Sequence, residues 1–104
     1  MITATYTFDH YMGDDYIVTR VITLTVRRGG VARKRYGKTT FLRARFPRLL
    51  AWQAGRRLRR EGYSRADDRL YAEWCAVHHV REPAVRVPYV PFGRWLEARN
   101  GAVQ

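Results

Sequence analysis

The chain has 104 residues and a formal net charge of +11, with 20 lysine and arginine residues against 9 aspartate and glutamate residues. This length suits one domain, and a hydrophobic content of 46% with 13% aromatic residues excludes a disordered basic tail. The chain has no apolar run of roughly 20 residues, and its first residues lack the basic and apolar regions of a secretory signal, so we expect none. Its single cysteine excludes an intramolecular disulfide. We therefore expect one basic domain over 1–104 in an intracellular, cytoplasmic protein without membrane association.

The first third of the chain has the pattern of antiparallel strands. Residues 2–8 alternate between threonine and apolar or aromatic side chains, which predicts a half-buried strand. Residues 9–15 contain a glycine and three aspartates and are expected to form a loop. Alternation over 16–28 predicts a long strand with a bend or bulge. The Gly-Gly pair at 29–30 predicts a two-residue hairpin turn, followed by a third strand over 31–36.

The middle of the chain is expected to be largely helical. Residues 38–46 leave two alternatives open, a short helix that begins at a threonine or a fourth strand over 41–46. Pro47 suits the first position of a helix, and Gly62 suits the residue just past its end. This order of proline and glycine predicts a helix over 47–61.

A second helix and a proline-rich segment should follow. Ser64 is the expected N-cap of the second helix, with Asp67 as its capping-box partner, and the helix should run to about Val80. Prolines then predict extended backbone before a last short helix over 91–99. The expected fold class is α+β: an N-terminal three-stranded antiparallel β-meander (1–37), two packed helices in a helical part (38–81), and a short C-terminal strand and helix segment (82–104).

The positive charge is concentrated in the first half of the chain. Residues 16–60 hold 14 lysines and arginines and no acidic residue, whereas the rest has six basic residues and all nine acids. Such a one-sided field costs self-repulsion in the folded protein, and a polyanionic partner explains it best. The alternative is that arginine only solubilises the protein and reflects coding bias.

One face of the predicted helix over 47–61 mixes tryptophan with arginine. Four residues form the stripe that should face the core, namely Leu50, Ala51, Ala54 and Leu58. Trp52 lies on the opposite side among arginines, where an indole can stack on an unpaired base and a guanidinium can pair with phosphate. The alternative is that the sheet or the second helix buries Trp52 and the arginines lie at its edge.

The predicted hairpin turn is the second cationic candidate. Its flanking cations could straddle a phosphate backbone, and alternation places Arg33 and Arg35 on one face and Lys34 on the other. The alternative is that the charge only protects exposed strand edges from pairing. The candidate residues for contact with nucleic acid or an acidic partner are Arg27, Arg28, Arg33, Lys34, Arg35, Lys38, Arg43, Arg45, Arg48, Trp52, Arg56, Arg59 and Arg60.

The sequence does not support catalysis or metal binding. Cys75 precedes His78 and His79 at thiol–imidazole spacing, but a cysteine inside a helix is more often part of the core. A group of polar residues crowds the first predicted loop without calcium-loop spacing, namely Asp9, His10, Asp14 and Asp15. Zinc-finger cysteine pairs are missing from the chain. We expect no catalytic residue, no metal and no cofactor.

These features predict a non-enzymatic protein that binds DNA or RNA through phosphate contacts, so that its affinity depends on salt. One alternative is a small inhibitor, of the kind that a virus or mobile element encodes, which docks on an acidic protein of a nucleic-acid-processing machine. In that case Tyr89, Phe92 and Trp95 would be anchors, unless they cap the core. A small nuclease is a second alternative. The alternating strands also allow two copies to pair as a homodimer.

Overall fold

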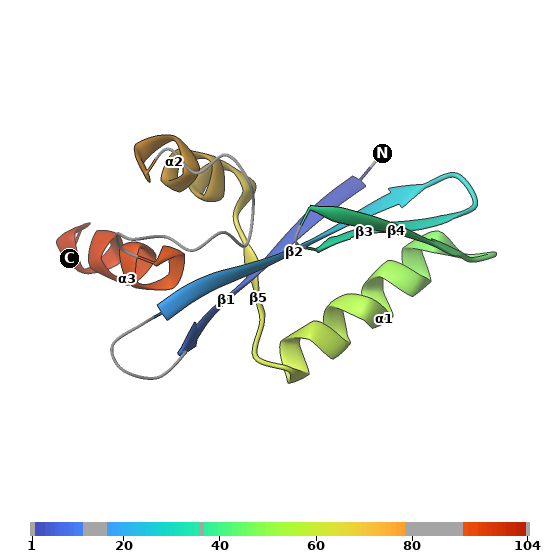
Figure 1. The fold of residues 1–104 in the computed structure, drawn as a ribbon, viewed down its shortest axis with the longest axis horizontal. Helices are drawn as coiled ribbons and strands as arrows, with labels where there is room; N and C mark the ends of the chain where they lie inside the picture. Colours follow the sequence, from blue (N-terminus) through green and yellow to red (C-terminus); the bar gives the residue numbers. More distant parts are fainter. Residues whose placement is uncertain (1, 12–16, 36, 79–90, 104) are drawn as a thin grey trace.

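The computed structural model describes residues 2–11, 17–35, 37–78 and 91–103 (Figure 1). Five strands form one antiparallel sheet in the order β4-β3-β2-β1-β5, and three helices accompany it. The elements are β1 (Ile2–Tyr11), β2 (Ile17–Arg27), β3 (Gly30–Arg35), β4 (Lys38–Arg43), α1 (Pro47–Arg60), β5 (Ser64–Ala66), α2 (Asp68–His78) and α3 (Phe92–Val103). The predicted α+β class, with an N-terminal meander followed by helices, is confirmed.

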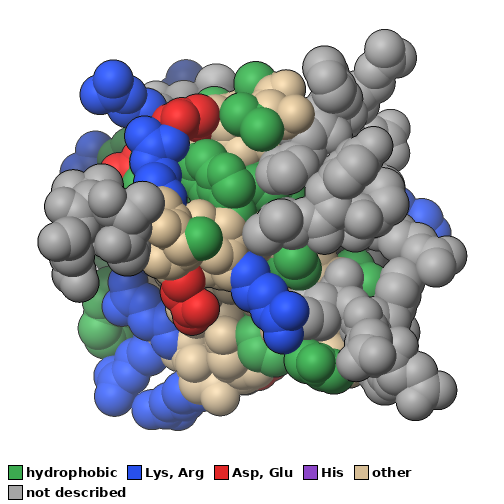
Figure 2. All heavy atoms as spheres, turned by 90° about the vertical axis from the view of Figure 1, so that its left-hand side faces the viewer, with side chains coloured by type: hydrophobic (Ala, Val, Ile, Leu, Met, Phe, Trp, Pro, Cys, Tyr) green, Lys and Arg blue, Asp and Glu red, His purple; other side chains and the backbone are tan. Residues whose placement is uncertain are grey.

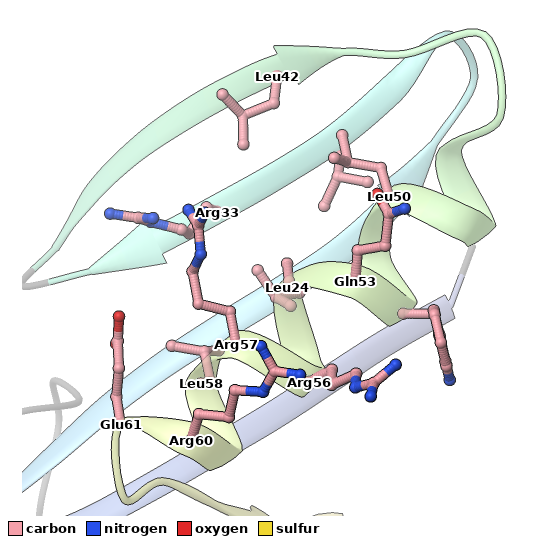
Figure 3. Close-up of a pocket in the computed structure, with 13 residues that line it drawn as sticks. Leu24, Arg33, Leu42, Leu50, Gln53, Arg56, Arg57, Leu58, Arg60 and Glu61 are labelled. Carbon is pink, nitrogen blue, oxygen red and sulfur yellow. The ribbon is translucent and has the colours of Figure 1, made fainter.

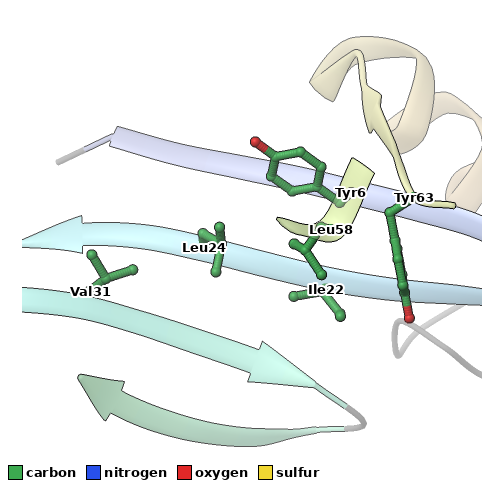
Figure 4. Close-up of a cluster of buried hydrophobic side chains, with 6 residues drawn as sticks. All are labelled: Tyr6, Ile22, Leu24, Val31, Leu58 and Tyr63. Atoms are coloured by element: carbon green, nitrogen blue, oxygen red, sulfur yellow. The ribbon is translucent and has the colours of Figure 1, made fainter. Parts of the chain in front are cut away.

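Helix α1 lies on one side of the sheet, and α2 and α3 lie together on the other side (Figure 1). α1 packs on one face around a core of Tyr6, Ile22, Leu24, Val31, Leu58 and Tyr63 (Figure 4). α2 and α3 enclose a second core on the other side, made of Ala66, Trp74 and Phe92 with Tyr71, Cys75, Trp95 and Leu96 around it. The predicted packing of the first two helices on each other is therefore wrong, because β5 lies between them in the chain and joins the sheet edge beside β1.

The three-stranded meander forms with small differences from the predicted pattern. β1 continues through Tyr11, so the predicted loop does not begin at Asp9. β1 and β2 pair without interruption from Ile2 opposite Val26 to Tyr11 opposite Ile17, which excludes a bulge in the long strand.

The turn between β2 and β3 lies one residue earlier than predicted. It consists of Arg28 and Gly29, and of the two neighbouring glycines only Gly29 has a positive φ, of 85°. Gly30 already pairs with Arg27 in the sheet. Glycine is needed at this position for a different reason, because a Cβ atom there would lie 2.2 Å from the carbonyl oxygen of Leu42 in β4.

The strand alternative for 38–46 is confirmed, although β4 begins three residues earlier than predicted and ends at Arg43. The proline and glycine that predicted α1 stand at its two ends. Pro47 stands at its N-terminus, it ends at Arg60, and Gly62 follows with a φ of 109°. All four residues of the expected core stripe pack in or against the first core.

The predicted start of the second helix is wrong. Ser64 belongs to β5, which pairs with β1, and the side-chain cap of α2 is Asp67. One carboxylate oxygen of Asp67 accepts the backbone N–H groups of Arg69 and Leu70, at 2.9 and 3.1 Å. The predicted end of this helix beyond residue 78 and the extended segment over 84–90 lie outside the described residues.

The start of α3 is capped by the sheet. The hydroxyl of Thr19 accepts the N–H of Phe92 at 3.0 Å and donates to Asp9 Oδ1 at 3.0 Å, while Asp9 Oδ2 accepts the N–H of Arg94 at 3.2 Å. A Cβ atom on Gly93 would lie 2.6 Å from that carboxylate, so glycine permits the close approach. The helix then continues to Val103, past the end predicted at residue 99.

Candidate nucleic-acid interface

Charge is segregated along the molecule. The acid-free residues 16–60 supply β2, β3, β4 and α1, whereas most described acids lie on β1, β5–α2 and α3. Figure 2 shows the α2–α3 end, where acidic side chains (red) occur among basic ones (blue). Two ion pairs, Arg65 with Asp68 and Arg99 with Glu73, belong to this mixed part. The basic part of the sequence is thus also one part of the fold.

A groove of about 530 Å³ lies between α1 and the β3–β4 hairpin (Figure 3). Its floor is apolar and buried, formed by Leu24, Val31 and Leu58, and its walls include Leu42 and Leu50. Exposed polar side chains border it, namely Arg33 from β3 and Gln53, Arg56, Arg57, Arg60 and Glu61 from α1 or its C-terminal end. Cations therefore border an apolar floor from both the sheet side and the helix side.

Strand register explains why the sheet contributes both apolar and charged groups to one face. Leu24 pairs with Arg33, and Val31 pairs with Leu42, so these side chains point toward α1. Arg35 pairs with Lys38 and continues the same face beyond the groove. Lys34 pairs with Thr23 and Thr39 on the opposite face, which confirms the predicted alternation.

A second group of candidate cations gathers at the other end of the hairpin. The N–H of Ala44 donates to the carbonyl of Gly29 at 3.0 Å, which holds the β2–β3 turn beside the entry to α1. This contact places the strand ends and the helix start close together, with five candidate residues there: Arg27, Arg28, Arg43, Arg45 and Arg48. The structure thus divides most of the candidates into a groove group and a turn group, and Arg59 is exposed on α1 without lining the groove.

Trp52 is exposed, so the alternative that the sheet or second helix buries it is wrong. Its residue surface is 59% accessible, and the Arg56 guanidinium lies 5.6 Å from its ring centroid. Arg45 lies equally far from the ring of Phe46. Five large apolar side chains are exposed between the start of β4 and the middle of α1, namely Phe41, Leu42, Phe46, Leu49 and Trp52. Phe41 points to the sheet face opposite α1, whereas Leu42 points toward the helix. Exposed apolar and cationic groups therefore alternate along this part of the chain.

The groove itself was missed by sequence reasoning. Arg57, Gln53 and Leu42 were not among the candidate contact residues, yet each lines it. The available signal was the alternation of 38–43, because a strand there pairs Leu42 with Val31 and so turns Leu42 toward the helix. Which arginines of α1 border the groove depends on how the helix lies across the sheet.

The aromatic residues suggested as partner anchors mostly serve the second core. Phe92 is only 2% accessible and Trp95 packs against the same cluster, so the core-cap alternative is confirmed for both. Tyr89 lies outside the described residues. Trp74 is buried in the same core, whereas Val77, three residues later in α2, is exposed.

The suggested catalytic and metal-binding groups are not brought together in the described part of the chain. Asp9 belongs to the cap of α3, and among the described residues no three histidine, cysteine or acidic side chains could hold a metal ion. Burial raises the pKa of the Cys75 thiol, which favours its protonated form. Asp14, Asp15 and the side chains of both adjacent histidines lie outside the described residues.

No helix among the described residues has both the length and the apolar composition needed to cross a membrane. Comparisons with protein-family models, curated proteins and solved structures gave no match to this chain. The charge distribution and the groove therefore carry the functional interpretation.

Proposed function

We propose that the protein binds nucleic acid without catalysing a reaction on it. The single observation that supports this function best is the segregation of charge: the acid-free residues form β2, β3, β4 and α1, and their arginines border a groove from two sides. A guanidinium forms two parallel hydrogen bonds with a phosphate, and its charge displaces condensed counterions. Neighbouring arginines on a rigid sheet and helix provide several such contacts at once.

Phosphate contacts explain affinity better than sequence selectivity. The backbone carries the same charge at every nucleotide, so a surface of this kind positions the strand without distinguishing its bases. We therefore expect binding to both DNA and RNA, with an affinity that falls steeply as salt increases.

The test is fluorescence anisotropy with labelled DNA and RNA, single-stranded and duplex, between about 50 and 200 mM salt. The variant Arg56→Glu/Arg59→Glu reverses two charges on the exposed side of α1. Its control is Arg69→Glu/Arg94→Glu, which changes the net charge equally in the α2–α3 part. We expect the first pair to weaken binding about 10-fold or more and the control pair about 2-fold or less. Absence of binding to every oligonucleotide, or equal losses in both variants, would refute the proposal.

The same oligonucleotides test the absence of catalysis. After incubation with and without a chelator they should remain intact on a denaturing gel. Cleavage of the oligonucleotides by an activity that co-purifies with the protein would show a nuclease instead.

An acidic protein partner is a second candidate function. The exposed apolar side chains of β4 and α1 favour it, because aromatic residues and arginine dominate the energetic centres of protein interfaces. A pull-down from lysate separates the two functions. Partners that disappear after nuclease treatment support nucleic-acid binding, whereas one stoichiometric protein that survives treatment and competes with oligonucleotide supports the second candidate.

A further inference from the structure

We infer that the groove between α1 and the β3–β4 hairpin holds an unpaired base, which makes single-stranded nucleic acid the ligand class. This inference rests on the proposed nucleic-acid function and assigns the groove a part in it. Its volume of about 530 Å³ falls within the range of about 300–1,000 Å³ typical of small-ligand sites.

The accessible apolar lining of the groove is the feature that phosphate binding leaves unexplained. Leu24 and Val31 at the bottom belong to the core, so the apolar surface open to a ligand comes mainly from Leu42, which is 40% accessible, and Trp52, which is 59% accessible. Phosphates gain nothing from such a surface, whereas a base has apolar faces that do. In a duplex the bases are stacked on each other and cannot enter a groove, so a single strand fits both the apolar lining and the charged border.

The border of the groove complements the rest of a nucleotide. Arg33 on one side and Arg57 and Arg60 on the other can contact the phosphates that flank a seated base (Figure 3). Gln53 adds an amide, which can donate to and accept from the polar edge of a base. The single acid at the border, Glu61, stands after the last turn of α1 and so marks the end of the cationic part.

Exposed aromatic rings beside the groove extend the same chemistry. Trp52 lines its outer side with Arg56 at 5.6 Å from the ring centroid, and Phe46 with Arg45 lies at the start of the same helix. Rings in this setting offer stacking surfaces to the bases that follow along a strand. Double-stranded nucleic acid provides no free base faces to use them.

The experiment compares two oligonucleotides of about 10 nucleotides with the same number of phosphates, one of oligothymidylate and one with abasic sites throughout. Both are titrated against the full chain by anisotropy, and a duplex of equal length is a third probe. We expect the base-bearing strand to bind about 10-fold more tightly than the abasic strand. Leu42→Ala, which trims the groove wall, should reduce that ratio about 3- to 10-fold and leave the affinity for abasic strand unchanged.

The neighbouring residue provides a matched control. Phe41 is also a large exposed side chain of β4, but it points to the opposite face of the sheet, so Phe41→Ala should leave the ratio unchanged. Gln53→Ala, on an exposed helix position where alanine is favourable, is a second groove variant in case Leu42→Ala fails to fold.

The outcomes separate this inference from the function on which it rests. Equal affinity for base-bearing and abasic strands would overturn the base site while phosphate binding stands. Equal effects of the Leu42 and Phe41 substitutions would also overturn it. If neither strand nor the duplex binds, the proposed nucleic-acid function itself fails.

Discussion

Arginine removal at the groove should change the salt dependence of binding by an amount that can be calculated. Arg57 and Arg60 are exposed, lie one turn apart near the end of α1 and line the same groove. In the variant Arg57→Gln/Arg60→Gln both side chains stay polar but become shorter and lose their charge. Gln and Arg have similar helix propensity, so the variant removes two cations from the border of the groove without an intrinsic cost to the helix.

The magnitude follows from counterion release. Each phosphate contact with a single strand contributes about 0.7 to the slope of log affinity against log salt, so two lost contacts reduce the slope by about 1.4. Between about 50 and 200 mM salt this difference amounts to a factor of about 7 in the affinity ratio of wild type to variant. The loss of binding should be large at low salt and should shrink as salt rises.

Anisotropy titrations at four or five salt concentrations measure these slopes. The control Arg69→Gln/Arg94→Gln removes the same total charge from the starts of α2 and α3, and its slope should remain close to that of the wild type. Removing cations from the last turn of α1 also costs about 1 kcal/mol of helix-dipole stabilisation, so urea denaturation must show that the variant stays folded. A slope unchanged in the groove variant, or reduced equally in the control, refutes the assignment of these two arginines to phosphate.

Three further predictions concern stability. Asp9→Ala removes the cap of α3 and the acceptor of a buried hydroxyl, so in urea denaturation it should lower the free energy of unfolding by about 2–4 kcal/mol. Asp9→Asn should lower it by only about 1 kcal/mol. Equal effects of the two substitutions would contradict the cap. Gly30→Ala should cost about 2 kcal/mol or more by the same measurement, because its Cβ would meet the backbone of β4, and a neutral result would show that the strands can separate freely. Burial raises the pKa of both Tyr71 and Cys75, so the folded state opposes their ionisation, and the free energy of unfolding should fall as pH rises above about 8.5. In Tyr71→Phe/Cys75→Ala this fall should be smaller between pH 7 and 10. A fall of the same size in the variant would assign it to other groups.

Local patterns were sufficient to predict the elements whose signals are local. Alternation over 2–8 and over 16–28 identified β1 and β2, and proline followed by glycine at the expected positions identified α1. The same alternation placed Arg33 and Lys34 on opposite faces. β5 was missed because three residues are too few to show a period, and its pairing partner, Thr5 to Thr7, lies about sixty residues earlier in the chain.

For the candidate site, the sequence predicted which residues contribute positive charge but not how they are arranged. Charge counting located the basic surface, but it did not divide the cations into a groove group and a turn group, because that division depends on how α1 crosses the sheet. For Trp52 the helical wheel left exposure and burial equally open. Only the placement of α2 on the other side of the sheet decides that no helix covers the indole.

The cap of α3 has a consequence for the order in which the protein folds. Asp9 and Thr19 face each other across the paired strands β1 and β2, so the contact between their side chains needs no helix to form. The helix that it receives begins more than seventy residues after Thr19. Local hairpins close within microseconds, whereas contacts between distant parts of the chain form later. We therefore expect β1 and β2 to form the cap first and α3 to dock on it afterwards, so that changes in those two side chains affect this docking step.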